Sequence, residues 1–289
     1  MRAWVTGARP KTLFAAIGPV ATGGGLALAD GRFVLLPFLA ALAGALSIQI
    51  GTNLANDYSD YRRGADSGER LGSIRVTQAG LLPPRSVRRG AAVCFGAAVL
   101  LGIYLIRVGG WPILGLGLAS IVAGITYTGG PWPFGYHGLG DLFAFLFFGP
   151  FAVGGTYYVQ ALTLSPDPLL AGSGSGALVT AILVVNNLRD IETDRRSGKR
   201  TLAVRLGARR TRLEYAALLL IGALVPLVGW QASGWSGGGL LAWGAFLLAP
   251  AALRTVFRPG DPRSLNPVLG RTALLSALYG VLFAVGVNL

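Results

Sequence analysis

Runs of residues without a formal charge recur along the whole chain and alternate with short polar segments. Most runs are close to the ~20 residues, within a range of ~17–25, that an apolar helix needs to cross a bilayer. The sixth run is rich in Gly and Ser, and the eighth is short. The pattern predicts nine transmembrane helices, at residues 12–29, 33–55, 90–106, 108–128, 142–164, 168–188, 215–235, 238–253 and 272–289. We therefore expect an all-α polytopic membrane protein, with residues 1–289 forming one domain of nine helices around a central cavity.

The composition agrees with this pattern, and the placement of charge gives an orientation. Only 13% of the residues are charged, about half the share in a typical soluble domain. A net charge of +13 suits nucleic-acid binding, but its distribution argues against it. With the N-terminus in the cytoplasm, all 25 Lys and Arg residues except Arg32 and Arg107 lie on one side, as the positive-inside rule requires. We expect a multi-pass protein of the cell (inner) membrane, surrounded by membrane lipid, with cytoplasmic polar loops and no nucleic-acid partner.

The few acidic residues are concentrated in two places. Of twelve Asp and Glu residues, most lie in segments 57–69 and 190–194, which follow the second and sixth predicted helices. Both segments lie on the predicted cytoplasmic side. The chain has one Cys and one His, Cys94 and His137. With only one residue of each type, the chain cannot build a disulfide framework, a Cys/His zinc site or a Cys–His dyad.

Spacing within the acidic segments indicates a site. Residues four apart share one face of a helix. Turn formation explains one or two Asn and Asp residues at a helix end, but not two ladders in a chain so poor in acids. If the chain repeats a four-helix unit, the ladders come face to face. Their oxygen ligands suit a hard cation, Mg²⁺ or Ca²⁺. The ladders pair Asn53 with Asp57 and Asn56 with Asp60, and align Asn186, Asp190 and Asp194.

Basic residues surround both ladders and complete a potential phosphate site. Mg²⁺ commonly binds one or two carboxylates together with substrate phosphates, and Arg and Lys match phosphate oxygens. For most of these basic residues, the positive-inside rule alone is a sufficient explanation, without a function in phosphate binding. Arg189 is the exception, because it lies inside the second ladder. We interpret the segments as a site where metal holds a diphosphate whose apolar tail lies among the helices. The candidate diphosphate ligands are Arg75, Arg189, Lys199 and Arg200.

At these residues the sequence resembles the UbiA superfamily of intramembrane aromatic prenyltransferases, and within it the 1,4-dihydroxy-2-naphthoate polyprenyltransferase (MenA) branch. The second family motif, Asp-x-x-x-Asp, matches Asp190 and Asp194. Segments 129–141, "GGPWPFGYHGLGD", and 186–207, "NNLRDIETDRRSGKRTLAVRLG", also resemble that branch. Of the Tyr-x-x-x-Lys element found in some relatives, this chain has only the tyrosine, Tyr127, because Pro131 stands at the position of the Lys. The first motif, Asn-Asp-x-x-Asp with a third Asp, matches Asn56, Asp57, Asp60 and Asp66.

The resemblance implies a Mg²⁺-dependent enzyme of menaquinone biosynthesis. Such an enzyme transfers a polyprenyl group from polyprenyl diphosphate to an aromatic acid, 1,4-dihydroxy-2-naphthoate, and releases diphosphate and CO₂ to give demethylmenaquinone. It implies catalytic functions for Asp57, Asp60, Asp190 and Asp194, with Asp57 or Asp194 as the candidate that orients or deprotonates the acceptor hydroxyl. It implies metal ligands at Asn56, Asp60, Asp66, Asp190 and Asp194. The expected residues of the acceptor or prenyl cavity are Asn53, Gln78, Tyr127, Asn187 and Tyr157.

The chemistry adds one more group of residues and leaves alternatives open. Aromatic faces stabilise an allylic cation, and the candidates are Tyr58, Tyr127, Phe143, Phe147, Tyr157 and Tyr158. A related prenyltransferase with another acceptor, such as homogentisate, hydroxybenzoate or a glycerol phosphate, fits the same motifs. A transporter is the alternative from another class, since intramembrane polar residues also mark ion pathways. However, the acids lie at helix ends rather than at the midplane, where transporters bind their substrates.

Overall fold

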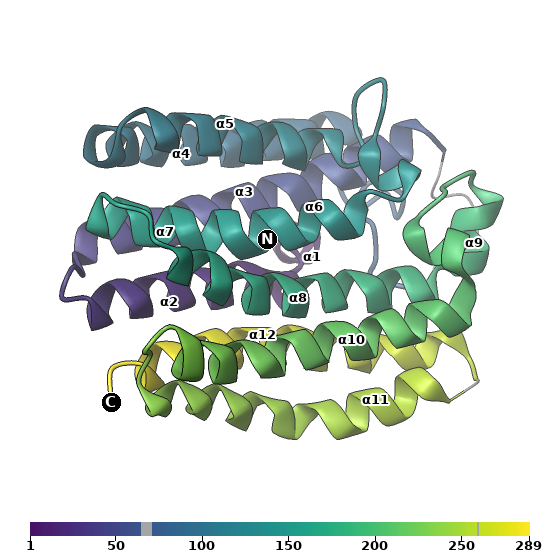
Figure 1. Ribbon diagram of the computed structural model, residues 1–289. Helices are drawn as coiled ribbons and strands as arrows, with labels where there is room; N and C mark the ends of the chain where they lie inside the picture. The colour runs from purple at the N-terminus through teal and green to yellow at the C-terminus, as the bar shows by residue number, and fades with distance from the viewer. Residues whose placement is uncertain (65–70, 259) are drawn as a thin grey trace.

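The computed structural model describes residues 1–64, 71–258 and 260–289, and helices dominate these ranges. Within them, eight helical segments are long and apolar enough to cross a membrane. A further apolar helix, α5 (Trp111–Thr126), is shorter. The helices run side by side in an elongated bundle (Figure 1). The all-helical, multi-pass fold is confirmed, and the expected number of nine apolar helices is approximately right.

The bundle follows the chain in order. Its first half contains α1 (Arg2–Ala8), α2 (Pro10–Ala29), α3 (Leu35–Arg62), α4 (Pro84–Gly109) and α5. A connector with η1 (Phe134–His137) leads to one interrupted helix made of α6 (Gly140–Leu146), η2 (Phe147–Phe151) and α7 (Ala152–Ala161). The remaining elements are α8 (Pro166–Arg189), α9 (Ile191–Arg196), α10 (Leu202–Ala232), η3 (Gly237–Leu248), α11 (Ala249–Phe257), η4 (Pro262–Ser264) and α12 (Leu265–Gly286).

Two breaks in the helices have identifiable causes. Between α1 and α2, Arg9 adopts a left-handed conformation with φ of 52°, and Pro10 starts the next helix without an N–H group. Between α6 and α7, a π-helical turn contains Pro150. Gly149 in this turn lies against α8 so closely that a Cβ atom would come within 2.6 Å of the Gly172 carbonyl oxygen. The second break therefore lets the interrupted helix pack tightly on α8.

The sixth predicted span, which is rich in Gly and Ser, is the most buried of the eight. In α8, 78% of the apolar window is buried, and the helix packs against α2, α6, α10 and α12. A Cβ atom on Gly174 would lie 2.5 Å from the Tyr279 hydroxyl, and Ser175 shares a 3.1 Å hydrogen bond with Thr22 of α2. Small residues therefore let α8 form the centre of the bundle, which explains why this span is rich in Gly and Ser.

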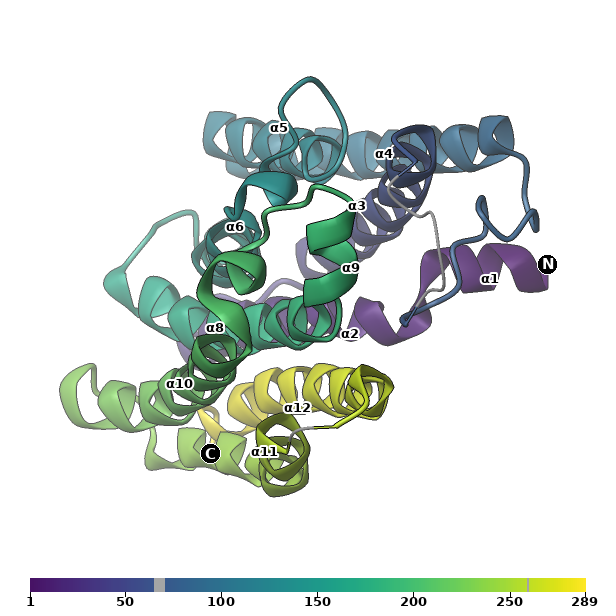
Figure 2. The same ribbon diagram turned by 90° about the vertical axis from the view of Figure 1, so that its right-hand side faces the viewer.

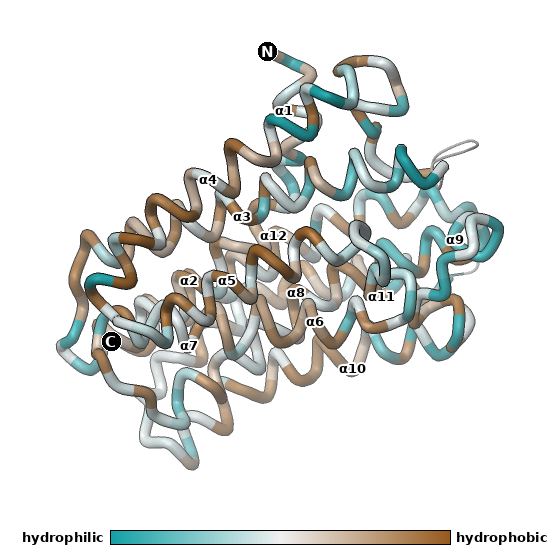
Figure 3. The backbone as a smooth tube through the Cα atoms, turned by 90° about the horizontal axis from the view of Figure 1, so that it is seen from above, coloured by the Kyte–Doolittle hydropathy of each residue, from teal (hydrophilic) through white to brown (hydrophobic). Residues whose placement is uncertain are grey.

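The polar connections gather at one end of the bundle. The α3–α4, α5–α6, α8–α10 and α11–α12 connections lie there, with α9 across that end (Figures 1 and 2). Hydrophilic residues cluster at the same end (Figure 3). Arg32 and Arg107 lie near the opposite end, at the ends of α2 and α4. Asp57 and Asp60 of the first acidic segment therefore share one end with the second acidic segment, as their spacing along the chain predicted.

Candidate active site

Asp60, in the last turns of α3, is the centre of the first cluster. Its side chain is 0% exposed, and its Oδ2 atom lies 2.6 Å from Nη2 of Arg75 and 3.4 Å from Nζ of Lys199. Its Oδ1 atom accepts a 2.8 Å hydrogen bond from the Tyr136 hydroxyl. A buried carboxylate is tolerable only when it is paired and hydrogen-bonded. Asp60 therefore joins α3 to three connecting segments.

Tyr136 in η1 was not predicted from the sequence. The charged groups of Arg63 and Lys199 lie 5.6 Å and 4.8 Å from the centre of its ring, distances at which a cation is attracted to an aromatic face. Its carbonyl oxygen also accepts a 2.9 Å hydrogen bond from the Arg200 N–H group. Tyr136 thus connects the segments that follow both ladders. The resemblance of segment 129–141 to relatives was the only signal of its importance.

Asp57 has a different environment from Asp60, although both belong to one motif. Its Oδ2 and Oδ1 atoms accept hydrogen bonds of 2.8 Å and 3.1 Å from the N–H groups of Val76 and Thr77. These residues directly follow Arg75. Asp57 therefore holds in place the segment that carries Arg75. Both of its oxygens are engaged, so the predicted function of Asp57 as a base finds no support in these contacts.

The two asparagines of the first ladder also make contacts within the protein. Asn53 donates hydrogen bonds to the Ala8 carbonyl oxygen (3.0 Å) and to Oγ1 of Thr12 (2.9 Å). It thereby links the end of α1 to the start of α2. The Asn56 side-chain oxygen accepts a 2.8 Å hydrogen bond from the Thr128 hydroxyl. Asn56 remains a predicted metal ligand, but its oxygen is partly satisfied by Thr128.

Arg189 organises the second cluster. It is 5% exposed, and its Nε and Nη2 atoms donate to the two carboxylate oxygens of Asp190 at 2.8 Å and 2.6 Å. Nη2 also donates to Asn186 (2.7 Å), and Nη1 donates to Asn266 of α12 (2.9 Å). Asn266 in turn donates to the Leu71 carbonyl oxygen at 2.8 Å. Arg189 therefore links α8 and α12 to the segment after the first cluster, and four hydrogen bonds already use its donors.

Asp194 in α9 is the least compensated of the motif carboxylates. Partial burial raises the pKa of Asp194 to about 7, and the negative charges of Asp190 and Asp60 add to this effect, while Lys199 opposes it. No hydrogen bond reaches its carboxylate from any residue that the structure describes. Asp190 and Asp60 are thus close enough to disfavour the charged form of Asp194, although burial is the larger cause.

A hard divalent cation fits this set of oxygen donors. It would offset the negative charges that Asp60 and Asp190 place beside Asp194. Within residues 1–64, 71–258 and 260–289, however, no three acidic, His or Cys side chains are already arranged around a shared position. The reason is that Asp60 and Asp190 face arginines instead. Asp66, a further predicted ligand, lies outside the described residues.

Several predicted site residues lie elsewhere. Gln78 and Arg200 are exposed in their connecting segments, and Asn187 is buried within α8. The Tyr157 hydroxyl donates a 2.5 Å hydrogen bond to Asp30, at the end of the bundle opposite α9. Gln78, Asn187 and Tyr157 are not among the residues that line the cavity described next. The structure therefore does not place these three residues in the lining of the cavity.

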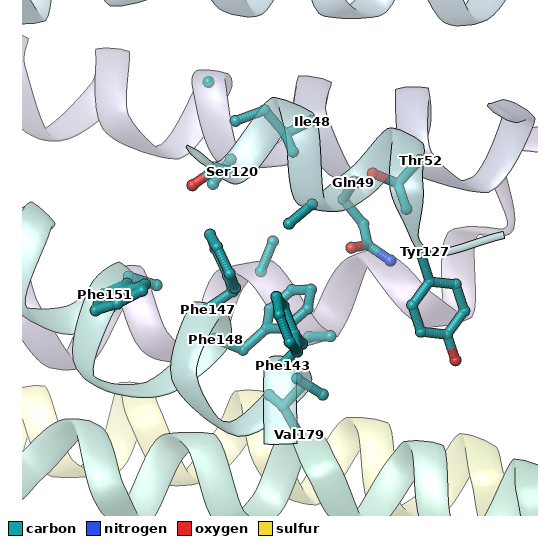
Figure 4. A pocket seen from close by; sticks show the side chains of 18 of the residues that line it. Ile48, Gln49, Thr52, Ser120, Tyr127, Phe143, Phe147, Phe148, Phe151 and Val179 are labelled. Atoms are coloured by element: carbon teal, nitrogen blue, oxygen red, sulfur yellow. The ribbon is translucent and has the colours of Figure 1, made fainter. Parts of the chain in front are cut away.

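A cavity of about 410 Å³ extends from the clusters into the bundle. Its size falls within the usual range of ligand pockets, about 300–1,000 Å³. Beyond Tyr127 the lining is mainly apolar, with the rings of Phe143, Phe147, Phe148 and Phe151 (Figure 4). Tyr127, Phe143 and Phe147 were expected to face a substrate, whereas Phe148 and Phe151 were not. The residues that line its polar end include Arg9, Asn53, Asn56, Arg75 and Asn186.

Comparisons with known proteins agree with this geometry. Residues 16–284 match the UbiA prenyltransferase family. The chain is 42% identical over 284 residues to the 1,4-dihydroxy-2-naphthoate octaprenyltransferase of Mycobacterium tuberculosis, covering 97% of this chain and 95% of that protein. It is 41% identical over 299 residues to the enzyme of the same name from Escherichia coli, covering 100% and 96%. Both similarities extend over nearly the whole chain.

Two solved structures show the same fold. A UbiA homolog from Aeropyrum pernix K1, in its apo form, superposes with a TM-score of 0.71 at 15% identity, covering 95% of this chain and 97% of the other. A UbiA homolog from Archaeoglobus fulgidus, bound to GPP and Mg²⁺, superposes with a TM-score of 0.68 at 14% identity, covering 99% of each chain. At such low identity these likenesses establish the fold alone.

Proposed function

Because the chain belongs to the UbiA prenyltransferase family, we propose that it transfers a polyprenyl group from its diphosphate to 1,4-dihydroxy-2-naphthoate. Diphosphate and CO₂ leave, and the product is the reduced form of demethylmenaquinone. Relatives named for this acceptor are 32–42% identical to the chain, and a UbiA prenyltransferase domain-containing protein 1 from Gallus gallus is 30% identical. These relatives lend no support to the alternative acceptors or to a transporter.

One observation carries the proposal: two clusters of acids and bases meet at the polar end of an apolar cavity. Arg75 both pairs with Asp60 and lines the cavity. A diphosphate bound there would lie beside the buried guanidinium of Arg75 and the ammonium group of Lys199. The apolar polyprenyl chain would then extend past Phe143 and Phe147. This arrangement matches a substrate with one highly charged end and one long hydrocarbon end.

We also propose that Mg²⁺ is the cofactor. The support is the oxygen donor set, the position of Asp194 near the carboxylates of Asp190 and Asp60, and a homolog of the same fold that was solved with GPP and Mg²⁺. Asp60, Asp190 and Asp194 would hold the ion, with Asn56 and Asp66 as further predicted ligands, and the bound ion would supply positive charge to offset the charge on the departing diphosphate. Arg75 and Lys199, once drawn from Asp60, are placed to contact the same diphosphate.

The residues of the chain account for the remaining needs of the reaction. The carbon–oxygen bond of the prenyl diphosphate breaks, and its electron pair leaves with the diphosphate. Ring faces of Phe143 and Phe147 stabilise the allylic cation, and the apolar cavity keeps water away from it. A ring carbon of the acceptor forms the new carbon–carbon bond, and the bond to the carboxylate breaks to release CO₂. Both substrates must therefore lie at the depth where the clusters meet the aromatic lining.

We infer that the end of the bundle with α9 faces the cytoplasm, and that the membrane is the inner membrane. The support for the orientation is the charge asymmetry: among the described basic residues, only Arg32 and Arg107 lie near the opposite end, at the ends of α2 and α4. The support for the inner membrane is the set of apolar helices together with bacterial relatives. Polyprenyl diphosphate has a charged group at one end only, so it would lie in the cytoplasmic leaflet with that group at the clusters.

An acceptor panel tests the proposed function. Purified protein in lipid nanodiscs is incubated with Mg²⁺, a polyprenyl diphosphate and one acceptor: 1,4-dihydroxy-2-naphthoate, homogentisate, 4-hydroxybenzoate or glycerol phosphate. Mass spectrometry identifies the product, and released diphosphate is measured in parallel. We expect a prenylated product with the naphthoate. Preferential prenylation of another acceptor would refute the assignment, and no diphosphate release with any acceptor would favour the transporter.

A further inference from the structure

The polar stripe of α3 does not end at the first ladder. Gln49 lies four residues before Asn53 and seven before Asn56, so it shares a helix face with both. It therefore lies deeper in the bundle than either acidic cluster. Its side chain lines the cavity and projects into it from α3 (Figure 4). An amide thus stands in a mainly apolar part of the cavity.

The amide of Gln49 is not used by the protein. In the part of the chain that the structure describes, it makes no hydrogen bond. Its neighbours differ in this respect: Asn53 donates to Ala8 and Thr12, and Ser120, also in the cavity, donates to the Leu116 carbonyl oxygen at 2.8 Å. A polar group in apolar surroundings without a partner is costly. Gln49 is half-buried in an open cavity where water can reach its amide, so a ligand that displaces this water must supply the hydrogen-bond partners instead.

The position of Gln49 along the cavity narrows the ligand. In Figure 4 its amide lies between Tyr127 and the rings of Phe143 and Phe147. The Tyr127 carbonyl oxygen accepts a 2.9 Å hydrogen bond from Gly135, next to Tyr136, so Tyr127 packs against the segment that reaches the clusters. Gln49 therefore stands where the charged end of the cavity gives way to its hydrocarbon end. In the proposed function, this is the depth at which the new carbon–carbon bond would form.

The chemistry of an amide indicates which of the two substrates Gln49 can bind. A glutamine side chain offers two N–H donors and an acceptor oxygen, and it carries no charge. The polyprenyl chain has no polar atoms, and the diphosphate belongs with the basic residues at the polar end. The acceptor ring, by contrast, carries hydroxyl groups that donate and oxygens that accept.

We propose that the Gln49 amide binds a polar ring substituent of the aromatic acceptor, and so orients the ring for attack on the prenyl group. This inference rests on the proposed function, because it takes the acceptor from it. Gln49 neither gains nor loses a proton in the reaction. Its effect is on acceptor affinity and on the choice between acceptors, since a site built to bind a hydroxyl group rejects an analogue that lacks it.

The test compares Gln49→Met with wild type. Methionine keeps the length and approximate volume of the side chain and removes both hydrogen-bonding groups. We expect the KM for the acceptor to rise by about tenfold, as expected for one lost hydrogen bond of this kind, while the KM for polyprenyl diphosphate changes by less than about twofold. Gln231→Met is the matched control, because it makes the same replacement at an exposed residue of α10 that does not line the cavity. It should leave both constants unchanged.

Acceptor analogues separate recognition from packing. Inhibition constants are measured for 1-hydroxy-2-naphthoate, 4-hydroxy-2-naphthoate and 1,4-dihydroxynaphthalene, each of which lacks one polar substituent of the acceptor. Against wild type, the analogue without the bound group should lose about tenfold in affinity relative to the acceptor. Against Gln49→Met the same analogue should lose little, because the partner is already absent. A role in packing alone would not produce this dependence on one substituent.

A second variant and direct binding keep the test decisive if the first comparison fails. If Gln49→Met unfolds in a thermal assay, Gln49→Asn replaces it. This variant keeps the amide but withdraws it by one methylene, and it should also raise the KM for the acceptor. An acceptor KM within twofold of wild type, or equal increases in both KM values, overturns the proposal. If wild type prenylates a different phenol, the proposed function fails, and the same comparison with that phenol decides the part played by Gln49. If wild type is inactive, direct binding of 1,4-dihydroxy-2-naphthoate to the two proteins decides it.

Discussion

The guanidinium group of Arg75 lies 2.6 Å from the carboxylate of Asp60, and both side chains are buried at the polar end of the bundle. One residue belongs to the predicted metal ligands and the other to the predicted diphosphate ligands. Without substrate, the two neutralise each other, which avoids the large penalty of an unpaired buried charge. Binding of Mg²⁺ and a diphosphate would give each of them a new partner of opposite charge.

Loss of a central carboxylate should abolish turnover. We expect Asp60→Asn and Asp190→Asn each to reduce kcat/KM by at least about 100-fold, the size of effect seen when one electrostatic contact to a transition state is removed. The control is Glu192→Gln, whose exposed ion pair with Arg195 contributes little. Initial rates of diphosphate release measure the effect. Near-normal rates in both Asp variants would remove the two clusters from the active site.

Asp57 should behave differently from Asp60, because it holds the backbone. Asp57→Ala leaves the N–H groups of Val76 and Thr77 buried without an acceptor, at about 1–3 kcal/mol each. We expect a lower temperature of thermal unfolding and a higher KM for polyprenyl diphosphate, because the segment that carries Arg75 loosens. Circular dichroism melting in nanodiscs gives the first quantity. An unchanged melting temperature would show that the two hydrogen bonds do not hold this segment.

Replacement of Arg189 by Lys should be far from conservative. The guanidinium makes four hydrogen bonds with Asp190, Asn186 and Asn266, and the single ammonium group of Lys cannot reproduce this planar fork. We expect Arg189→Lys to lower kcat/KM by at least about tenfold, equivalent to about 1.4 kcal/mol. Arg85→Lys, on the exposed start of α4, serves as the matched control. Equal activity of the two variants would reduce Arg189 to one of the many basic residues on its side of the membrane.

The orientation of the bundle is open to chemical labelling. In a Cys94→Ala background, single cysteines replace the exposed residues Gln78, Arg195 and Thr163. A thiol reagent that cannot cross the membrane should label the first two sites only in inside-out vesicles, and the third only in right-side-out vesicles. The reverse pattern would place the clusters on the outer face.

The sequence predicted the helices and the end at which the two clusters meet, because uncharged runs and charge asymmetry record the membrane directly. The Gly and Ser residues of α8 made its span look weak, yet they allow it to pack at the centre. Hydropathy measures the side chain and not the closeness of its neighbours. Likewise, the aromatic character of Tyr157 does not indicate how deep in the bundle it lies. Its hydroxyl contacts Asp30, at the end of the bundle opposite the two clusters.

The contacts within the site were harder to predict. Asp57 and Asp60 are three residues apart in one motif, so they point about 60° apart around α3; one meets backbone N–H groups and the other meets Arg75 and Tyr136. Tyr136 lies in a connection rich in Gly and Pro, whose path does not follow from periodicity. Gln49 could have been found, because the four-residue ladder from Asn53 extends to it.

The stoichiometry of a single reaction tests the central claim most directly. Purified protein, Mg²⁺ and polyprenyl diphosphate are mixed with 1,4-dihydroxy-2-naphthoate labelled with ¹³C in its carboxyl group, and diphosphate, labelled CO₂ and prenylated product are measured together. We expect all three to form in equal amounts, to stop when a chelator removes Mg²⁺, and to resume when Mg²⁺ is restored. Diphosphate release without prenylated product, or a product that retains the labelled carboxyl group, would contradict the account.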